Sequence, residues 1–182
     1  MKISTKQMLN VLYVLSWVIF LGLCIEAGGF IFNAFFTQVL NPVGAKYFWQ
    51  EIDLSSLYKY DHVAFFTETF VMCAIAVIKA YLFYLIVKIL YDKKLNTYQP
   101  FNEETGRFVL KVSYVSLLIG AISWCGCEFT EWLVRQGVVM PDIQYLRLSG
   151  GDVWLLMGVT LFVIAQIFQR GIEIQTENDL TI

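Results

Sequence analysis

The sequence predicts an all-α membrane protein, a bundle of four transmembrane helices with both chain ends in the cytoplasm. Of its 182 residues, 58% are hydrophobic and only 15% are charged, whereas soluble chains average about 45–50% apolar and about 25% charged residues. Four apolar stretches approach the roughly 20 helical residues that cross a bilayer. The basic residues are concentrated in segments that would share one side of the membrane.

The predicted transmembrane helices comprise residues 8–32, 63–90, 108–132 and 152–170. Uncharged runs at 8–25, 112–127 and 153–169 form three of their cores, and only Lys79 interrupts the second. Lipid offers the backbone no hydrogen-bond partners, so each stretch must be helical. Asn102 suits an N-cap, with Glu103 and Glu104 in the first turn, and Arg170 followed by Gly171 suits the end of the fourth helix.

The orientation follows from the lysines and arginines, which are enriched in cytoplasmic segments. With the N-terminus inside, the outer segments hold only Lys46, Lys59, Arg135 and Arg147. The cytoplasmic segments hold Lys2, Lys6, Lys88, Lys93, Lys94, Arg107, Lys111 and Arg170. The first apolar run is long for a signal peptide and lacks a clean small-x-small cleavage site, so we interpret it as a retained anchor.

The longest predicted loop, residues 33–62, is extracytoplasmic and rich in aromatic side chains. These are Phe35, Phe36, Tyr47, Phe48, Trp49, Tyr58 and Tyr60. Aromatic rings with polar tips favour the headgroup region, so we expect the loop to fold back on the membrane surface or to cap the bundle. Asp53 before Leu-Ser-Ser-Leu predicts a short helix. A ligand-sensing loop is the functional alternative.

Lys79 is the most informative polar residue inside a predicted transmembrane helix. A lysine near the middle of a bilayer costs at least about 2.5–3.5 kcal/mol on insertion scales. At the same depth the other three helices carry Ser16, Ser116 and Thr160, which predicts a polar layer around the ammonium group. In the alternative interpretation, the flexible side chain reaches the cytoplasmic headgroups.

Three carboxylates form the second candidate site, at the outer part of the first three helices. They are Glu26, Glu68 and Glu128. If they converge, they would bind a cation or carry a proton. If Glu26 and Glu128 instead lie at the membrane boundary, they simply reach water.

Other classes of site lack support in the sequence. The net charge of −2 and the pI of about 5.4 include no basic stripe for nucleic acid. His62 is the only histidine, and the four cysteines lie in apolar stretches where we interpret them as packing residues, so no metal set is expected. No catalytic or cofactor motif occurs, and we predict neither an enzyme nor a cofactor.

Three stretches resemble the bacterial membrane family catalogued as domain of unknown function 2975. They are Lys-Ala-Tyr-Leu-Phe-Tyr at 79–84, Pro-Phe-Asn-Glu-Glu at 100–104, and the ending Phe-Gln-Arg-Gly-Ile-Glu-Ile-Gln-Thr-Glu-Asn-Asp-Leu-Thr-Ile at 168–182. The resemblance covers residues 79–182 and implies a small four-span inner-membrane protein. Members are often encoded beside a helix-turn-helix regulator of the Cro/CI type, which implies a cytoplasmic partner of that class. The family has no established catalytic residues.

The predicted cytoplasmic tail, residues 171–182, gives this partnership a location. Its acidic and apolar side chains are Glu173, Glu177, Asp179, Leu180 and Ile182. We expect them to dock on a basic DNA-binding protein; the alternative is that the tail packs under its own bundle. The predicted function is therefore a regulatory or sensing interaction protein. The alternative function is a small transporter or ion-coupled protein that uses Lys79 and the outer glutamates. Either is compatible with a homo-oligomer.

Overall fold

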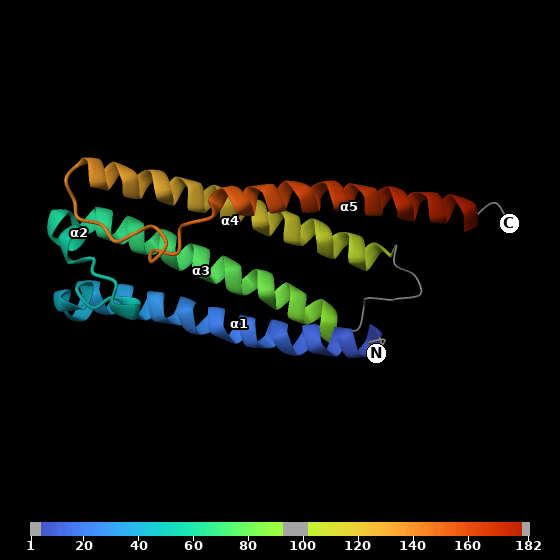
Figure 1. Cartoon of the computed structure of the whole chain (residues 1–182), viewed down its shortest axis with the longest axis horizontal. Helices are drawn as coiled ribbons and strands as arrows, with labels where there is room; N and C mark the ends of the chain where they lie inside the picture. The colour runs from blue at the N-terminus through green and yellow to red at the C-terminus, as the bar shows by residue number, and fades with distance from the viewer. Residues whose placement is uncertain (1–4, 93–101, 180–182) are drawn as a thin grey trace.

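Four long helices make up most of the computed structural model, which describes residues 5–92 and 102–179. They are α1 (Thr5–Phe35), α3 (His62–Tyr91), α4 (Glu103–Arg135) and α5 (Gly151–Asp179). α1 begins and α5 ends at the same end of the molecule, called here the terminal end (Figure 1). The opposite loop end carries residues 36–61 and 136–150. An even number of membrane crossings requires this arrangement of the two ends.

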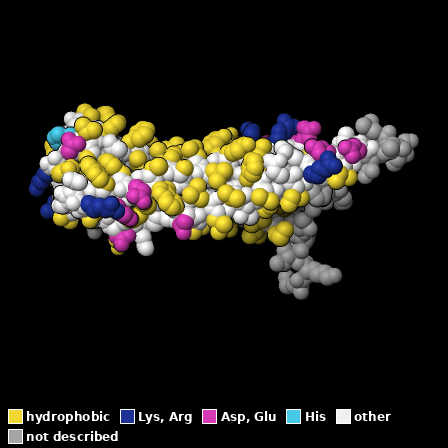
Figure 2. Space-filling view, turned by 90° about the horizontal axis from the view of Figure 1, so that it is seen from above, with side chains coloured by type: hydrophobic (Ala, Val, Ile, Leu, Met, Phe, Trp, Pro, Cys, Tyr) yellow, Lys and Arg dark blue, Asp and Glu magenta, His cyan; other side chains and the backbone are white. Residues whose placement is uncertain are grey.

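All four long helices are long and apolar enough to cross a membrane, over Gln7–Leu40, His62–Tyr91, Glu103–Arg135 and Gly151–Glu177. Figure 2 shows hydrophobic side chains covering the middle of the visible face, with charged side chains toward the two ends. Such an apolar band between polar ends is what a bilayer stabilises. The chain therefore has the composition and shape of a multi-pass membrane protein.

The helices pack in an open row rather than in a closed bundle. Among the described residues, α1 packs on α3, α3 on α4, and α4 on α5, whereas α1 and α5 make no comparable helix contact (Figure 1). Lipid chains are as apolar as leucine, so no hydrophobic force pulls the outer helices together. The predicted all-α class with four long apolar helices is confirmed, and the structure shows that these helices form a row.

The contact between α4 and α5 depends on two glycines. A Cβ atom on Gly120 would lie 2.7 Å from Leu155 Cγ and 2.8 Å from its backbone nitrogen, and one on Gly158 would lie 2.9 Å from the Leu117 nitrogen. Small residues of this kind let helix backbones approach closely in membranes. These contacts place the first turn of α5 beside residues 120–124, near the middle of α4.

The ends of the helices test the local signals in the sequence. The predicted N-cap is confirmed, because the Asn102 side chain accepts a hydrogen bond from the Thr105 N–H at 2.7 Å. The predicted stop at Arg170 and Gly171 is wrong, since α5 continues to Asp179. A Cβ atom on Gly106 of α4 would lie 3.5 Å from Ile172 Cδ1, so the helical turn that contains Gly171 packs on α4, which favours its continuation despite the helix-weakening effect of glycine.

Residues 36–61 fold over the loop end of α1 and α3, as expected for a cap. They form a π-helical turn (Phe36–Leu40), two 3₁₀ turns (Pro42–Ala45 and Trp49–Glu51) and α2 (Ser55–Tyr60). Phe48 is fully buried, with its ring 6.2 Å from that of Phe30 and 6.4 Å from that of Phe65. The short helix expected after Asp53 is present as α2.

The second connection, residues 136–150, runs back along the row instead of projecting from it (Figure 1). Leu146 and Leu148 are fully buried, and the Cys127 thiol donates a hydrogen bond to the Leu148 carbonyl at 3.4 Å. This loop therefore occupies the space beside the last three turns of α4, which α5 does not reach.

Candidate functional site

Arg147, near the end of the second connection, is the centre of a polar cluster that joins distant parts of the chain. Its Nε donates to Glu26 Oε1 of α1 at 2.6 Å, and its Nη2 donates to Gln50 Oε1 at 3.4 Å. Its carbonyl oxygen accepts a hydrogen bond from Lys79 Nζ of α3 at 3.3 Å. We call Glu26, Gln50, Lys79, Arg147 and Trp154 the Arg147 cluster.

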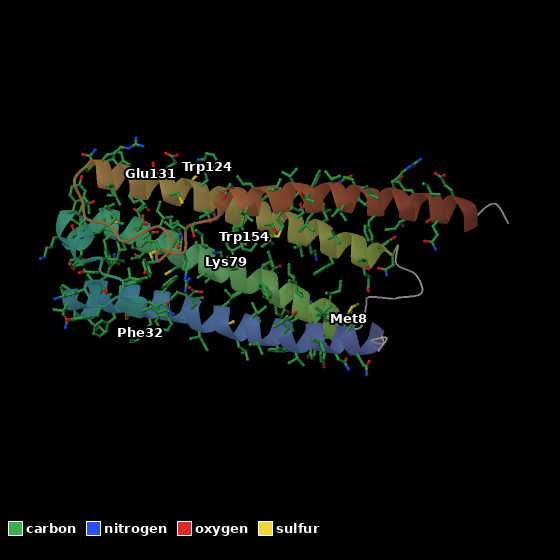
Figure 3. All side chains as sticks on the ribbon, in the orientation of Figure 1. Met8, Phe32, Lys79, Trp124, Glu131 and Trp154 are labelled. Carbon is green, nitrogen blue, oxygen red and sulfur yellow. The ribbon has the colours of Figure 1, made fainter. Side chains whose placement is uncertain are left out.

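Trp154 completes the cluster from the first turn of α5. Lys79 Nζ lies 5.8 Å from the centre of the Trp154 ring, within the range of a cation–π interaction. Figure 3 shows Lys79 and Trp154 close together near the middle of the molecule. The cluster thus contacts α1, α3, α5 and both loop-end connections, and it joins α1 to the segment that leads into α5.

Two strained residues belong to this cluster. Among the described residues, Gln50 (φ 56°) and Arg147 (φ 61°) are the only non-glycine residues with positive φ. The left-handed conformation costs about 1–2 kcal/mol per L-residue. Leu146 and Leu148, fully buried on either side, fix the backbone that presents Arg147 to Glu26. Strain of this kind persists where the surroundings over-determine it, and it concentrates at functional sites.

The charges of the cluster do not cancel. Glu26 attracts the Lys79 ammonium and Arg147 repels it, so one carboxylate faces two cations. The Glu26 side chain is 21% exposed and that of Arg147 is 48% exposed, which leaves the guanidinium partly accessible. The cluster therefore has the charge to bind an anionic group at Arg147.

The structure does not bring together the polar layer predicted around Lys79. Each predicted hydroxyl donates to the carbonyl four residues earlier in its own helix: Ser16 to Leu12, Ser116 to Val112 and Thr160 to Leu156. Lys79 instead turns toward the loop end and bonds to Arg147. Lys79 therefore does not lie in a layer of hydroxyl groups. It also does not extend toward the terminal end, which is what the alternative interpretation predicted.

The three predicted carboxylates also take separate positions. Glu26 pairs with Arg147, while Glu68 is fully buried and accepts a hydrogen bond from Thr130 at 2.8 Å. Glu128 is exposed on α4. No group of three His, Cys, Asp or Glu residues in the described part of the chain could hold a metal ion.

The predicted docking tail is helical as far as the structure describes it. Glu173 pairs with Arg170, the residue that precedes the tail, at 2.7 Å. Glu177 is exposed on the same helix. Asp179 ends α5 without a described side chain, and Leu180 and Ile182 lie outside the described residues. Glu173 and Glu177 thus form an exposed acidic face near the end of α5.

Asp53 is a charged residue of the loop-end cap, three positions after Gln50 in the sequence. Hydrogen bonds from the Ser55 hydroxyl and the Ser55 backbone N–H lower the pKa of the Asp53 carboxyl from its ordinary value of 3.8. The backbone bond is 2.8 Å long. Asp53 thereby fixes the chain between Gln50 and α2.

Sequence reasoning missed the residues at the centre of the cluster, namely Arg147, Gln50 and Trp154. One signal was present for Arg147, which stands between two leucines in the second connection and shortly before Gly150 and Gly151. Gln50 carries no comparable signal, because a left-handed glutamine is not marked by sequence.

Taken together, the fold and the cluster define a multi-pass α-helical protein in which polar contacts from the two loop-end connections reach α1 and α3. The chain belongs to the family described as protein of unknown function (DUF2975), whose profile matches residues 34–182. The match includes the resemblance seen at 79–182 and adds the loop-end cap and most of α3. No curated protein and no solved structure matches the chain.

Proposed function

We propose that this protein is a regulatory membrane protein that receives a signal at its loop end and holds a cytoplasmic protein at its terminal end. In this proposal it lies in the bacterial inner membrane, with both chain ends inside. The lysine and arginine distribution supports that orientation. The partner class is the helix-turn-helix regulator that the family resemblance implies.

The continuity of α5 is the observation that carries the proposal. This helix runs without interruption for 29 residues, from Gly151 beside the Arg147 cluster to Asp179 beyond the start of α4. Because a helix is stiff along its axis, a change in the contact between Trp154 and Lys79 would move the acidic face around Glu173 and Glu177. That face has the charge to bind a basic DNA-binding surface.

The ion-coupled alternative has less support from the geometry. A transport path requires polar groups that face a common route, whereas Lys79 and Glu26 both bond to Arg147 and Glu128 is exposed on α4. We therefore retain the interaction protein as the proposed function.

A crosslinked pull-down from native membranes tests the proposal, with the helix-turn-helix protein as the species scored. Reversing the charges of Glu173 and Glu177 to lysine should reduce its capture at least tenfold. The matched control is Glu103→Lys, because Glu103 is also an exposed acid at the terminal end and pairs with Arg107 as Glu173 pairs with Arg170. Arg147→Ala should also change the amount of helix-turn-helix protein captured, although Arg147 lies near the start of α5 and the acidic face lies near its end.

Two results would contradict the proposal. One is equal capture by the α5 variant and the Glu103→Lys control. The other is the absence of any helix-turn-helix protein from the wild-type pull-down across growth conditions. Deleting residues 172–182 should abolish regulation and leave any transport unchanged, whereas a transporter would respond to Glu68→Gln instead.

A further inference from the structure

Glu68 is a buried acid between α3 and α4 that the Arg147 cluster does not use. Its side chain is fully buried in a helix that is apolar enough to cross a membrane. Oε1 lies 2.8 Å from the Thr130 hydroxyl, and Oε2 is buried without a hydrogen-bond partner. No lysine, arginine or histidine of the described chain pairs with it. An unpaired carboxylate in such surroundings is very costly.

The hydrogen count at Thr130 indicates where a proton must be. The Thr130 hydroxyl has one hydrogen, yet it lies within bonding distance of two acceptors, Glu68 Oε1 at 2.8 Å and the Gly126 carbonyl at 2.9 Å. If Glu68 is a carboxylate, one of these two short contacts has no hydrogen. If Glu68 is a carboxylic acid, it donates to Thr130, and Thr130 donates to Gly126.

The charged groups around Glu68 do not provide another way to stabilise a carboxylate. On α4, the Cys127 thiol interacts electrostatically with Glu68 and also with Glu128 and Glu131, and none of these groups is a cation. On α1, Glu26 pairs with Arg147. On α2, Lys59 is exposed, and at the start of α3 the His62 ring packs on Tyr58.

We propose that Glu68 is a proton-binding site. In the packed structure its side chain is a carboxylic acid, and its O–H group donates a hydrogen bond to the Thr130 hydroxyl oxygen. The site lies where α3, α4 and the second connection meet, because a Cβ atom on Gly126 would touch both Val71 and Leu148. Loss of the proton would leave a charge in this contact and loosen the loop end. The proposal does not depend on a cytoplasmic partner.

Infrared spectroscopy of the full-length protein in lipid nanodiscs tests this directly. At neutral pH the wild type should show the carbonyl band of a protonated carboxyl group, and Glu68→Gln should lose it. Glu128→Gln is the matched control, an exposed glutamate on α4, and should leave the band unchanged. Thr130→Val should retain the band and move it to higher frequency, because the acid loses its hydrogen-bond partner.

A second measurement needs no variant. Uniform ¹³C labelling of the glutamates in the wild type should shift the same band to lower frequency, whereas ¹³C labelling of the aspartates should not. A wild-type spectrum without a protonated glutamate band at neutral pH would overturn the proposal. A band that survives in Glu68→Gln would overturn it equally.

Discussion

The two ends of the helix row are held together in different ways. At the loop end, the ion pair between Arg147 and Glu26 joins residues 121 positions apart in the sequence. At the terminal end, the described ion pairs are local, from Arg107 to Glu103 and from Arg170 to Glu173 within single helices. The long-range pair thus specifies a tertiary contact at the loop end, whereas the described ion pairs of the terminal end lie within single helices and leave their side chains exposed.

The largest effect on stability should come from the contact between α4 and α5, which lies between the two ends of the row. Gly120→Ala places a Cβ atom 2.8 Å from the Leu155 backbone nitrogen, and overpacking of this kind costs about 1–3 kcal/mol. The free energy of unfolding in detergent should fall by that amount. Gly22→Ala is the control, since a Cβ atom there meets nothing within 4 Å. Equal stability of the two variants would show that the α4–α5 contact is looser than described.

The next effect separates the tertiary ion pair from a local one. In a double-mutant cycle, replacing Glu26 and Arg147 with glutamine should give a coupling free energy of about 1 kcal/mol, because the pair is partly buried and charge-assisted. The same cycle on Glu103 and Arg107, which are 73% and 66% exposed, should give about 0.3–0.5 kcal/mol. Equal couplings would remove the distinction between the two ends.

The smallest effect concerns acid stability at the loop end. Because hydrogen bonds lower the pKa of Asp53, the folded state favours its carboxylate, and the unfolded state takes up the proton first as the pH falls below 3.8. The stabilisation is therefore present above that value and is lost below it. Asp53→Asn retains the turn but does not titrate, so its thermal midpoint should fall less than that of the wild type on acidification. Parallel curves would contradict this assignment.

The long helices could be predicted from the sequence because their caps and their apolar runs depend on interactions that each segment makes by itself, without knowledge of the tertiary fold. Asn102 needed only the N–H of Thr105 to act as a cap, and lipid solvation made the apolar runs helical. The stop at Gly171 failed because tertiary packing of Ile172 outweighed a local preference.

The site was less predictable, because depth along a helix does not specify direction around it. Ser116 and Thr160 were correctly placed in helices, but hydroxyls in apolar helices bond to their own backbone, and theirs do so. Lys79 was identified as unusual, yet its partner is a backbone carbonyl in a loop, which no residue pattern marks. Arg147 required the fold of residues 136–150 to be known first.

We expect the Arg147 cluster to fix the position of α5 relative to α1, because these two helices make no comparable contact of their own among the described residues. Electron–electron distance measurements between spin labels at Val11 of α1 and Thr176 of α5, both exposed positions, test this most directly. The labels would be placed in a chain whose four native cysteines are replaced. The distance distribution should be narrow in the otherwise unchanged chain, broaden with Arg147→Ala, and remain narrow with Arg107→Ala. Identical distributions in all three chains would contradict the account.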